Sequence, residues 1–207
     1  MNLDTTHLLA LAAALGWASG LRLYAVLFLT GLAGWLGWVD LPSGLRLLEN
    51  PLMLGASGLL LAVEFFADKI PGVDTLWDAV HTLIRIPAGA ALAGAVFGGD
   101  QATWAAIAAL LGGALAATSH VAKATTRAAV NTSPEPFSNL ALSLLGDAAV
   151  PTALWLATAH PVIALVVIAI ATLSMIAIVA LLMKVLRGVL ARWRARFGGA
   201  SHQAAEH

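Results

Sequence analysis

Residues 8–39 read LLALAAALGWASGLRLYAVLFLTGLAGWLGWV. This stretch decides the fold class, because it exceeds the roughly 20 apolar residues that cross a bilayer and its only charged residue is Arg22. A guanidinium at that depth needs a carboxylate or free backbone carbonyls, and a helix that breaks near Gly20 would free such carbonyls. We therefore predict a broken first helix with Arg22 directed into a helix bundle. The expected partner of Arg22 is the carboxylate of Glu64, Asp68 or Asp147.

The composition of the whole chain also indicates a membrane protein. Of its 207 residues, 60% are hydrophobic and 11% are charged, whereas soluble domains are about 45–50% apolar and about a quarter charged. At roughly 20 residues per crossing, this length predicts an all-α, polytopic integral membrane helix bundle of about six spans. We expect a single transmembrane domain over residues 1–190 and a basic cytoplasmic C-terminal tail over residues 191–207.

The charge balance and the absent cysteines exclude several classes of function. Eleven Lys and Arg residues balance eleven Asp and Glu residues, so the chain has no basic surface for nucleic acid. The sequence has no cysteine, which excludes disulfides, iron–sulfur clusters and thiolate zinc sites. We expect no metal and no cofactor. The expected partners are membrane lipid, a small ion or anionic lipid as substrate, and a second copy of the chain.

Prolines and glycines divide the rest of the chain into helices. We expect helices over residues 51–67, from about 75 to 98, over 101–131, over 137–159, and from 161 onward. Pro87 and Pro151 lie inside the third and fifth helices and predict kinks there. Asp74 or Thr75 is expected to cap the third helix. The parallel placement of these prolines leaves two alternatives open, an internal repeat or a coincidence in a sequence rich in Ala, Leu and Gly.

The distribution of basic residues predicts the orientation in the membrane. Lys184, Arg187, Arg192, Arg194 and Arg196 cluster near the C-terminus, which the positive-inside rule places in the cytoplasm. Six crossings would then put the N-terminus on the same side. The sequence therefore predicts a protein of the bacterial cytoplasmic (inner) membrane with both termini in the cytoplasm.

Charged residues inside the apolar segments form stripes at helical spacing. At 100° per residue, one face of the third helix carries Asp74, Asp78, His81 and Arg85, and one face of the fourth carries His120, Lys123 and Arg127. Glu64 and Asp68 form an acidic pair on the second helix. We expect these faces to meet, with Arg85 paired to Asp68 or Asp78 and with Glu64 paired to His120 or Lys123. Arg22 and Asp147 complete the set from the first and fifth helices.

The stripes leave three functions open. They could line the path of a small transporter or channel, hold the phosphate head of a polyprenyl-phosphate-type lipid in a carrier, or lock helices together by ion pairs alone. An intramembrane enzyme is less favoured, because it would depend on Asp78, His81 and His120 without any recognisable catalytic motif. A two-metal site is also weakly supported, since Asp78-x-x-His81 has no second copy in the chain.

Three segments carry a family resemblance: residues 18–25 (ASGLRLYA), residues 64–90 (EFFADKIPGVDTLWDAVHTLIRIPAGA) and residues 146–151 (GDAAVP). Together they resemble a bacterial family known as domain of unknown function 4126. The resemblance implies a multi-span membrane protein and brings no substrate. Residues 70–75 (IPGVDT) are also faintly similar to an element of the DedA-like carriers of polyprenyl phosphate, in which arginine stands at the position of Asp74.

Overall fold

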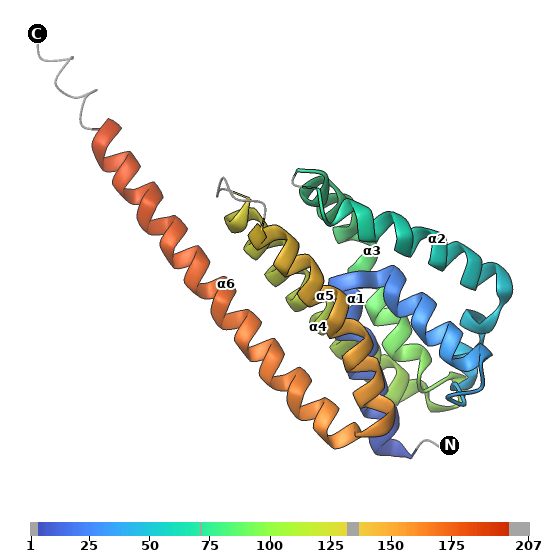
Figure 1. The fold of residues 1–207 in the computed structure, drawn as a ribbon. Coiled ribbons are helices and arrows are strands. Elements are labelled where there is room, and N and C mark those ends of the chain that lie inside the picture. Colours follow the sequence, from blue (N-terminus) through green and yellow to red (C-terminus); the bar gives the residue numbers. More distant parts are fainter. Residues whose placement is uncertain (1–3, 71, 132–136, 199–207) are drawn as a thin grey trace, which may run out of the picture.

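The computed structural model describes residues 4–70, 72–131 and 137–198, which are all-helical and contain no strand. Figure 1 shows them as a bundle from which one long helix extends. The elements in order are α1 (Thr5–Trp35), η1 (Ser43–Glu49), α2 (Pro51–Ala67), α3 (Val73–Ala95), η2 (Gly99–Gln101), α4 (Ala102–Val130), α5 (Phe137–Ala159) and α6 (Pro161–Gly198). The predicted all-α class is confirmed, and the predicted bounds of the second and fifth helices match α2 and α5.

Helix α1 lies at the centre of the bundle and packs against each of the other five α-helices. In its most apolar window, 78% of the residues are buried, compared with 11% in α6. Because α6 is also the most apolar of the four helices long enough to cross a membrane, with a mean hydropathy of 3.0 over its best window, its exposed side chains require an apolar solvent. The sequence of α6 thus fits lipid, and that of α1 fits a protein interior.

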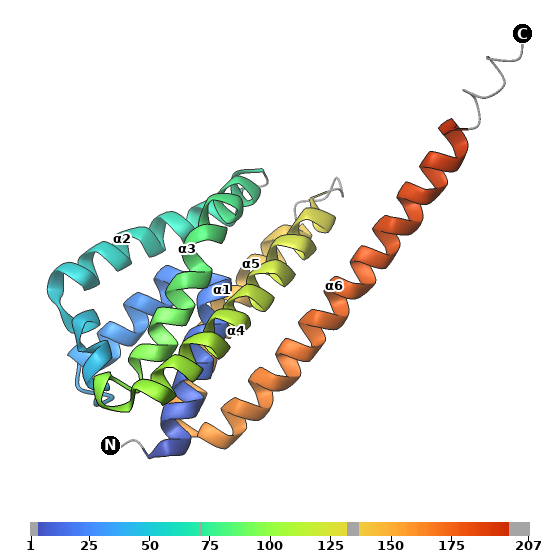
Figure 2. The same ribbon diagram turned by 180° about the vertical axis from the view of Figure 1, so that it is seen from behind.

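The continuous path of α1 is interrupted at Arg22. Its backbone there has φ −149° and ψ 88°, which is extended rather than helical. Figures 1 and 2 show the first part of α1 leading into the bundle and the second part turning back toward the end where η1 lies. The side chain of Arg22 is only 1% exposed. The predicted break near Gly20 and the inward direction of Arg22 are both confirmed.

Small residues let α1, α3 and α4 approach closely. A Cβ added to Gly112 of α4 would collide with the Cβ of Ala93 in α3, and one added to Gly20 would collide with Ser119 and Ala116 of α4. Without a hydrophobic drive between helices in lipid, such close contact is the main source of packing energy. This close packing also brings the polar part of α1 that follows Gly20 near the polar part of α4 that follows Gly112.

Four of the described helices are long and apolar enough to cross a membrane: α1, α4, α5 and α6. The bent pair η1 and α2 would make a fifth. Pro87 and Pro151 lie inside α3 and α5, as predicted, and both helices continue beyond them although proline donates no backbone hydrogen bond. The expected cap was wrong: Gly72 is the N-cap of α3 without a side-chain cap, and Asp74 accepts from the Gly72 and Thr75 amides within the first turn.

The first turn of α1 and the last turn of α6 lie at opposite ends of the bundle (Figure 1). The reason is the break, because α1 turns back at Arg22 instead of continuing to the far end. The α2–α3 connection, the end of α4 and the basic end of α6 all share one end of the bundle. The cytoplasmic location of the basic end of α6 stays a prediction. The expected location of the N-terminus on the same side does not fit this arrangement, in which α1 begins at the opposite end. The internal repeat stays one of two open alternatives, and the domain limits also stay a prediction.

Close packing at Gly112 can be tested with Gly112→Ala. The added methyl group meets Ala93, so we expect a loss of about 1–3 kcal/mol, measured as a lower melting temperature of the purified protein in detergent. The matched control is Gly188→Ala in α6, where no described atom lies within 4 Å of the added Cβ. If both variants melt like the unmodified protein, α3 and α4 do not pack as described.

Candidate functional site: a buried network of charges

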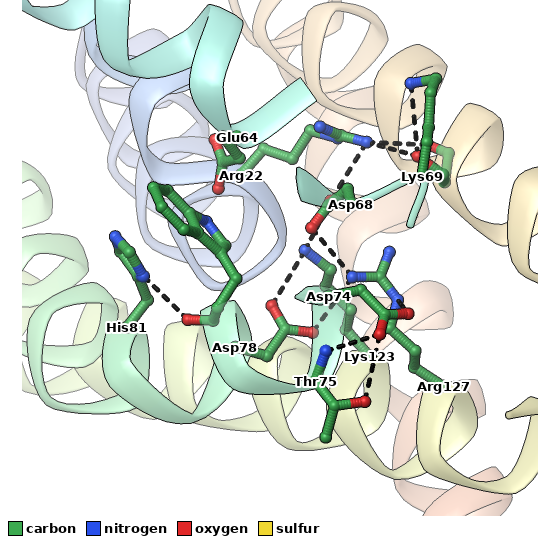
Figure 3. Close-up of polar contacts among 12 residues, drawn as sticks. Arg22, Glu64, Asp68, Lys69, Asp74, Thr75, Asp78, His81, Lys123 and Arg127 are labelled. Carbon is green, nitrogen blue, oxygen red and sulfur yellow. Dashed lines mark hydrogen bonds and ion pairs between the residues drawn. The ribbon is translucent and has the colours of Figure 1, made fainter. Parts of the chain in front are cut away.

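Charged side chains from α1 to α5 meet beside the break in α1 (Figure 3). The cations and the carboxylates are equal in number, so the cluster is electrically neutral. We call it the charge network. Its cations are Arg22, Lys69, Arg85, Lys123 and Arg127, and its carboxylates are Glu64, Asp68, Asp74, Asp78 and Asp147.

Arg22 joins α1 to the end of α2 and to α5. Its Nη2 lies 3.2 Å from Asp68 Oδ2 and 3.0 Å from Asp147 Oδ1, and it donates to the carbonyl and the hydroxyl of Ser143 at 3.1 and 2.9 Å. The predicted pairing of Arg22 with a carboxylate is therefore confirmed, and two of the three candidates, Asp68 and Asp147, take part. Asp147 also pairs with Lys69 at 3.0 Å, so the α5 end of the network carries both signs of charge.

Arg85 of α3 holds the third predicted carboxylate. Its Nη2 lies 2.7 Å from Glu64 Oε1 and its Nη1 lies 2.7 Å from Asp78 Oδ1. The expected pairing of Arg85 with Asp78 is confirmed. The expected pairing of Glu64 with His120 or Lys123 is wrong, because Lys123 reaches Asp68, one turn further along the chain, at 2.9 Å.

Asp68 and Asp78 share two cations of α4. Lys123 Nζ lies 2.9 Å from Asp68 and 3.2 Å from Asp78, and Arg127 Nη1 lies 2.9 Å and 3.2 Å from the same two residues. Asp68 is fully buried and Asp78 nearly so. Each of these four groups has at least two partners of opposite charge, so one contact can break without leaving a charge unpaired.

Asp74 forms the outer edge of the network. It lies 3.4 Å from Arg127 Nε and accepts hydrogen bonds from Asn131 at 3.2 Å. The predicted stripes on α3 and α4 therefore do face each other, and both meet the end of α2. Residues that our sequence analysis missed complete the site: Tyr24, Lys69, Thr82 and Ser143.

Two histidines flank the network, and their hydrogen bonds indicate their tautomers. His120 Nε2 lies 2.7 Å from Thr82 Oγ1, which donates to a backbone carbonyl, so His120 Nε2 is the donor. His120 Nδ1 then accepts from Arg85 at 3.4 Å. His81 Nδ1 lies 2.8 Å from the carbonyl of Trp77 and its Nε2 lies 3.1 Å from the Tyr24 hydroxyl. His120 is thus held by α3 through both ring nitrogens, and His81 is held by Trp77 of its own helix and by Tyr24 of α1.

Several buried polar atoms of the network have no hydrogen-bond partner among the described residues. They include Nε and Nη1 of Arg22, Oε2 of Glu64 and Nε of Arg85. Buried polar atoms are normally paired with protein or water, and an unpaired one costs about 1–3 kcal/mol. The network therefore has hydrogen-bond donors and acceptors that water or a solute could satisfy. Within the described residues, no group of three or more His, Asp and Glu side chains is arranged to hold a metal ion.

The fold and the site define a polytopic membrane helix bundle with a buried ion-pair network. A family model matches residues 9–181, so the chain belongs to the family described as domain of unknown function (DUF4126). The resemblance noted in the sequence is thereby confirmed. No curated protein and no solved structure matches the chain significantly.

Removing Arg22 should damage the protein more than removing a surface arginine. Arg22→Ala leaves the buried carboxylate of Asp68 with one cation fewer and Asp147 with only Lys69, and removing one partner of a buried pair costs about 3–5 kcal/mol. We expect a large loss of expression and of melting temperature in detergent. Arg46→Ala, at an exposed position in η1, is the control. Equal tolerance of the two substitutions would mean that Arg22 is not held by these carboxylates.

A double-mutant cycle tests the Glu64–Arg85 pair. Arg85→Met leaves Glu64 without its cation and should lower stability by about 3–5 kcal/mol, whereas adding Glu64→Met to it should restore part of that loss. Stability is measured as the melting temperature of each variant in the same detergent. Additive losses in the double variant would show that the two side chains do not interact.

Proposed function

We propose that this protein is a small membrane transporter or channel whose polar path runs through the charge network. The observation that carries the proposal is the sharing of charges, since Asp68, Asp78, Lys123 and Arg127 each have two or more partners of opposite sign. A solute ion can replace one partner at a time while every other charge stays compensated. Such stepwise exchange is what passage through a low-dielectric region requires.

The size and burial of the network favour this role over a structural lock. Buried ion pairs add little net stability, because the cost of desolvation offsets their attraction. Ionisable groups within membrane helices are expensive and mark ion or proton pathways more often than simple packing contacts. A lock between helices would need one or two pairs, whereas this network joins five helices and still has unpartnered donors and acceptors.

His120 supplies a means of coupling the network to protons. It is surrounded by Arg85, Asp78 and Thr82 of α3 and by Lys123 of its own helix. A proton on Nδ1 would point at Arg85 Nη1, so protonation replaces a hydrogen bond with repulsion between two cations. Arg85 would then be released toward Glu64, and the contacts between α3 and α4 would loosen.

The basic residues favour one orientation. Lys69, Arg127 and the basic end of α6 belong to the same end of the bundle, and the positive-inside bias puts this end in the bacterial cytoplasm. The charge network then lies in the cytoplasmic half of the protein. The inner-membrane location and this orientation belong to the proposal.

Transport can be tested by reconstituting the protein into liposomes and applying rapid concentration steps of protons, sodium, potassium, chloride and inorganic phosphate. We expect a flux of at least one of these probes above that of empty liposomes. Asp78→Asn should reduce this flux at least tenfold without lowering the yield of folded protein, because it removes a charge shared by Arg85, Lys123 and Arg127. Asp4→Asn, which keeps a capping side chain on the exposed start of α1, should transport normally.

Two outcomes would contradict the proposal. One is a correctly folded protein that passes none of the five probes at either membrane polarity. The other is an Asp78→Asn protein that transports normally, or one that loses transport only because it no longer folds, as judged by its elution and melting temperature. The second pattern would identify the network as a structural lock between helices.

A further inference from the structure

A cavity of about 340 Å³ lies between α1, α4, α5 and α6 on the side of the network away from α3. Its volume is in the lower part of the range of ligand pockets, about 300–1,000 Å³. Arg22, Asp68, Lys123 and Arg127 form its charged wall. Side chains of α5 and α6 form an apolar wall that includes Leu142, Leu145, Ala171, Met175 and Ile178.

The unpartnered polar atoms at this cavity are donors. Arg22 lines the cavity at 1% exposure, and its Nε and Nη1 have no hydrogen-bond partner among the described residues. Trp17 also lines the cavity, and its indole Nε1, which can only donate, is likewise buried without a partner in the described structure. Gly146 keeps the space beside Arg22 open, because a Cβ added there would occupy it, in van der Waals contact with Nε at 3.5 Å. A ligand that satisfies these groups must supply acceptor oxygens.

The charges facing the cavity favour an anion. Three cations line it, Arg22, Lys123 and Arg127, but only one carboxylate does so, that of Asp68. The other carboxylates that pair with these cations, Asp74, Asp78 and Asp147, do not line this cavity. Arginine forks match phosphate oxygens well, and Arg22 presents two free nitrogens.

The apolar wall favours a lipid over a soluble anion. Helix α6 diverges from α4 and α5 toward its C-terminal end in both views (Figures 1 and 2), and its outward side chains are apolar. An acyl chain beside α6 would therefore continue from the cavity into the surrounding lipid. A free phosphate ion would leave this wall uncovered.

We propose that this cavity binds the phosphate head of an anionic lipid, with Arg22 as the main anchor and the acyl chains along α6. This site does not depend on transport, since a lipid could occupy it in a channel, a carrier or a structural protein. The probe is phosphatidylglycerol, added to delipidated full-length protein in detergent and detected as a bound adduct by native mass spectrometry.

We expect one phosphatidylglycerol per chain, retained at least tenfold better than phosphatidylcholine, and no competition from free glycerol phosphate at the same concentration. Met175→Trp and Ile178→Trp fill the cavity from α6 without touching an ion pair, and each should reduce the adduct at least tenfold. Leu173→Trp, on the exposed side of α6, should retain it. Two independent filling variants are used so that the test still stands if one of them does not fold.

Equal retention of the two lipids, or a full adduct in both filling variants, would overturn this inference. Effective competition by glycerol phosphate would instead indicate a soluble anion as the ligand and also overturn it. A protein that binds phosphatidylglycerol as described but passes none of the probe ions would overturn the proposed transport and leave the lipid site in place.

Discussion

The fold depends on one buried guanidinium at an interruption in its central helix. A guanidinium is a permanent charge, so a bundle that buries Arg22 must provide carboxylates at that depth. Asp68 at the end of α2 and Asp147 in α5 do so, and their positions draw both helices to α1. The extended backbone at Arg22 turns the second part of α1 back. The space that a straight α1 would have filled is taken by α2, α3 and the charge network. The compensation of this charge therefore ties α1 to the end of α2 and to α5.

The same pairing of opposite charges determines the electrostatics of the whole network. Because carboxylates and cations are equal in number and most have at least two partners, the bundle buries many charged groups with no net charge. A set of this kind is stable as a whole while its individual pairs remain exchangeable. His120 contacts Thr82 and Arg85 in the α3 part of the network, whereas Arg22, with its unpartnered nitrogens, lines the cavity beside α5 and α6. One part of the network thus contacts a group that protons can charge, and another part faces a cavity bounded by the lipid-facing helix α6.

Much of this was accessible from the sequence, and the reasons are physical. The long apolar run made the cost of Arg22 obvious, and helical spacing placed Asp74, Asp78 and Arg85 on one face, as the structure confirms. The pairing of Glu64 with Arg85 was not predictable from the sequence. The i, i+4 spacing shows which face of a helix a side chain lies on, but it does not show at which level along their axes two helices meet. Lys69 was missed because it follows Asp68 at a helix end, where its side chain turns toward α5. The direction of the second part of α1 also escaped prediction, since one non-helical residue reverses a helix without changing its composition.

The central claim is that water and solute reach the charge network, and the chain is well suited to a direct measurement because it has no cysteine. The variant Thr82→Cys would place a single cysteine beside His120 in the network, and Ser174→Cys would place one on the exposed face of α6. The rate of labelling by a trimethylammonium methanethiosulfonate reagent is measured for both in intact proteoliposomes. The account predicts that the cysteine at position 82 is labelled readily and that the cysteine at 174, in lipid, is not. Labelling at position 82 only after denaturation would show a sealed network and contradict the claim.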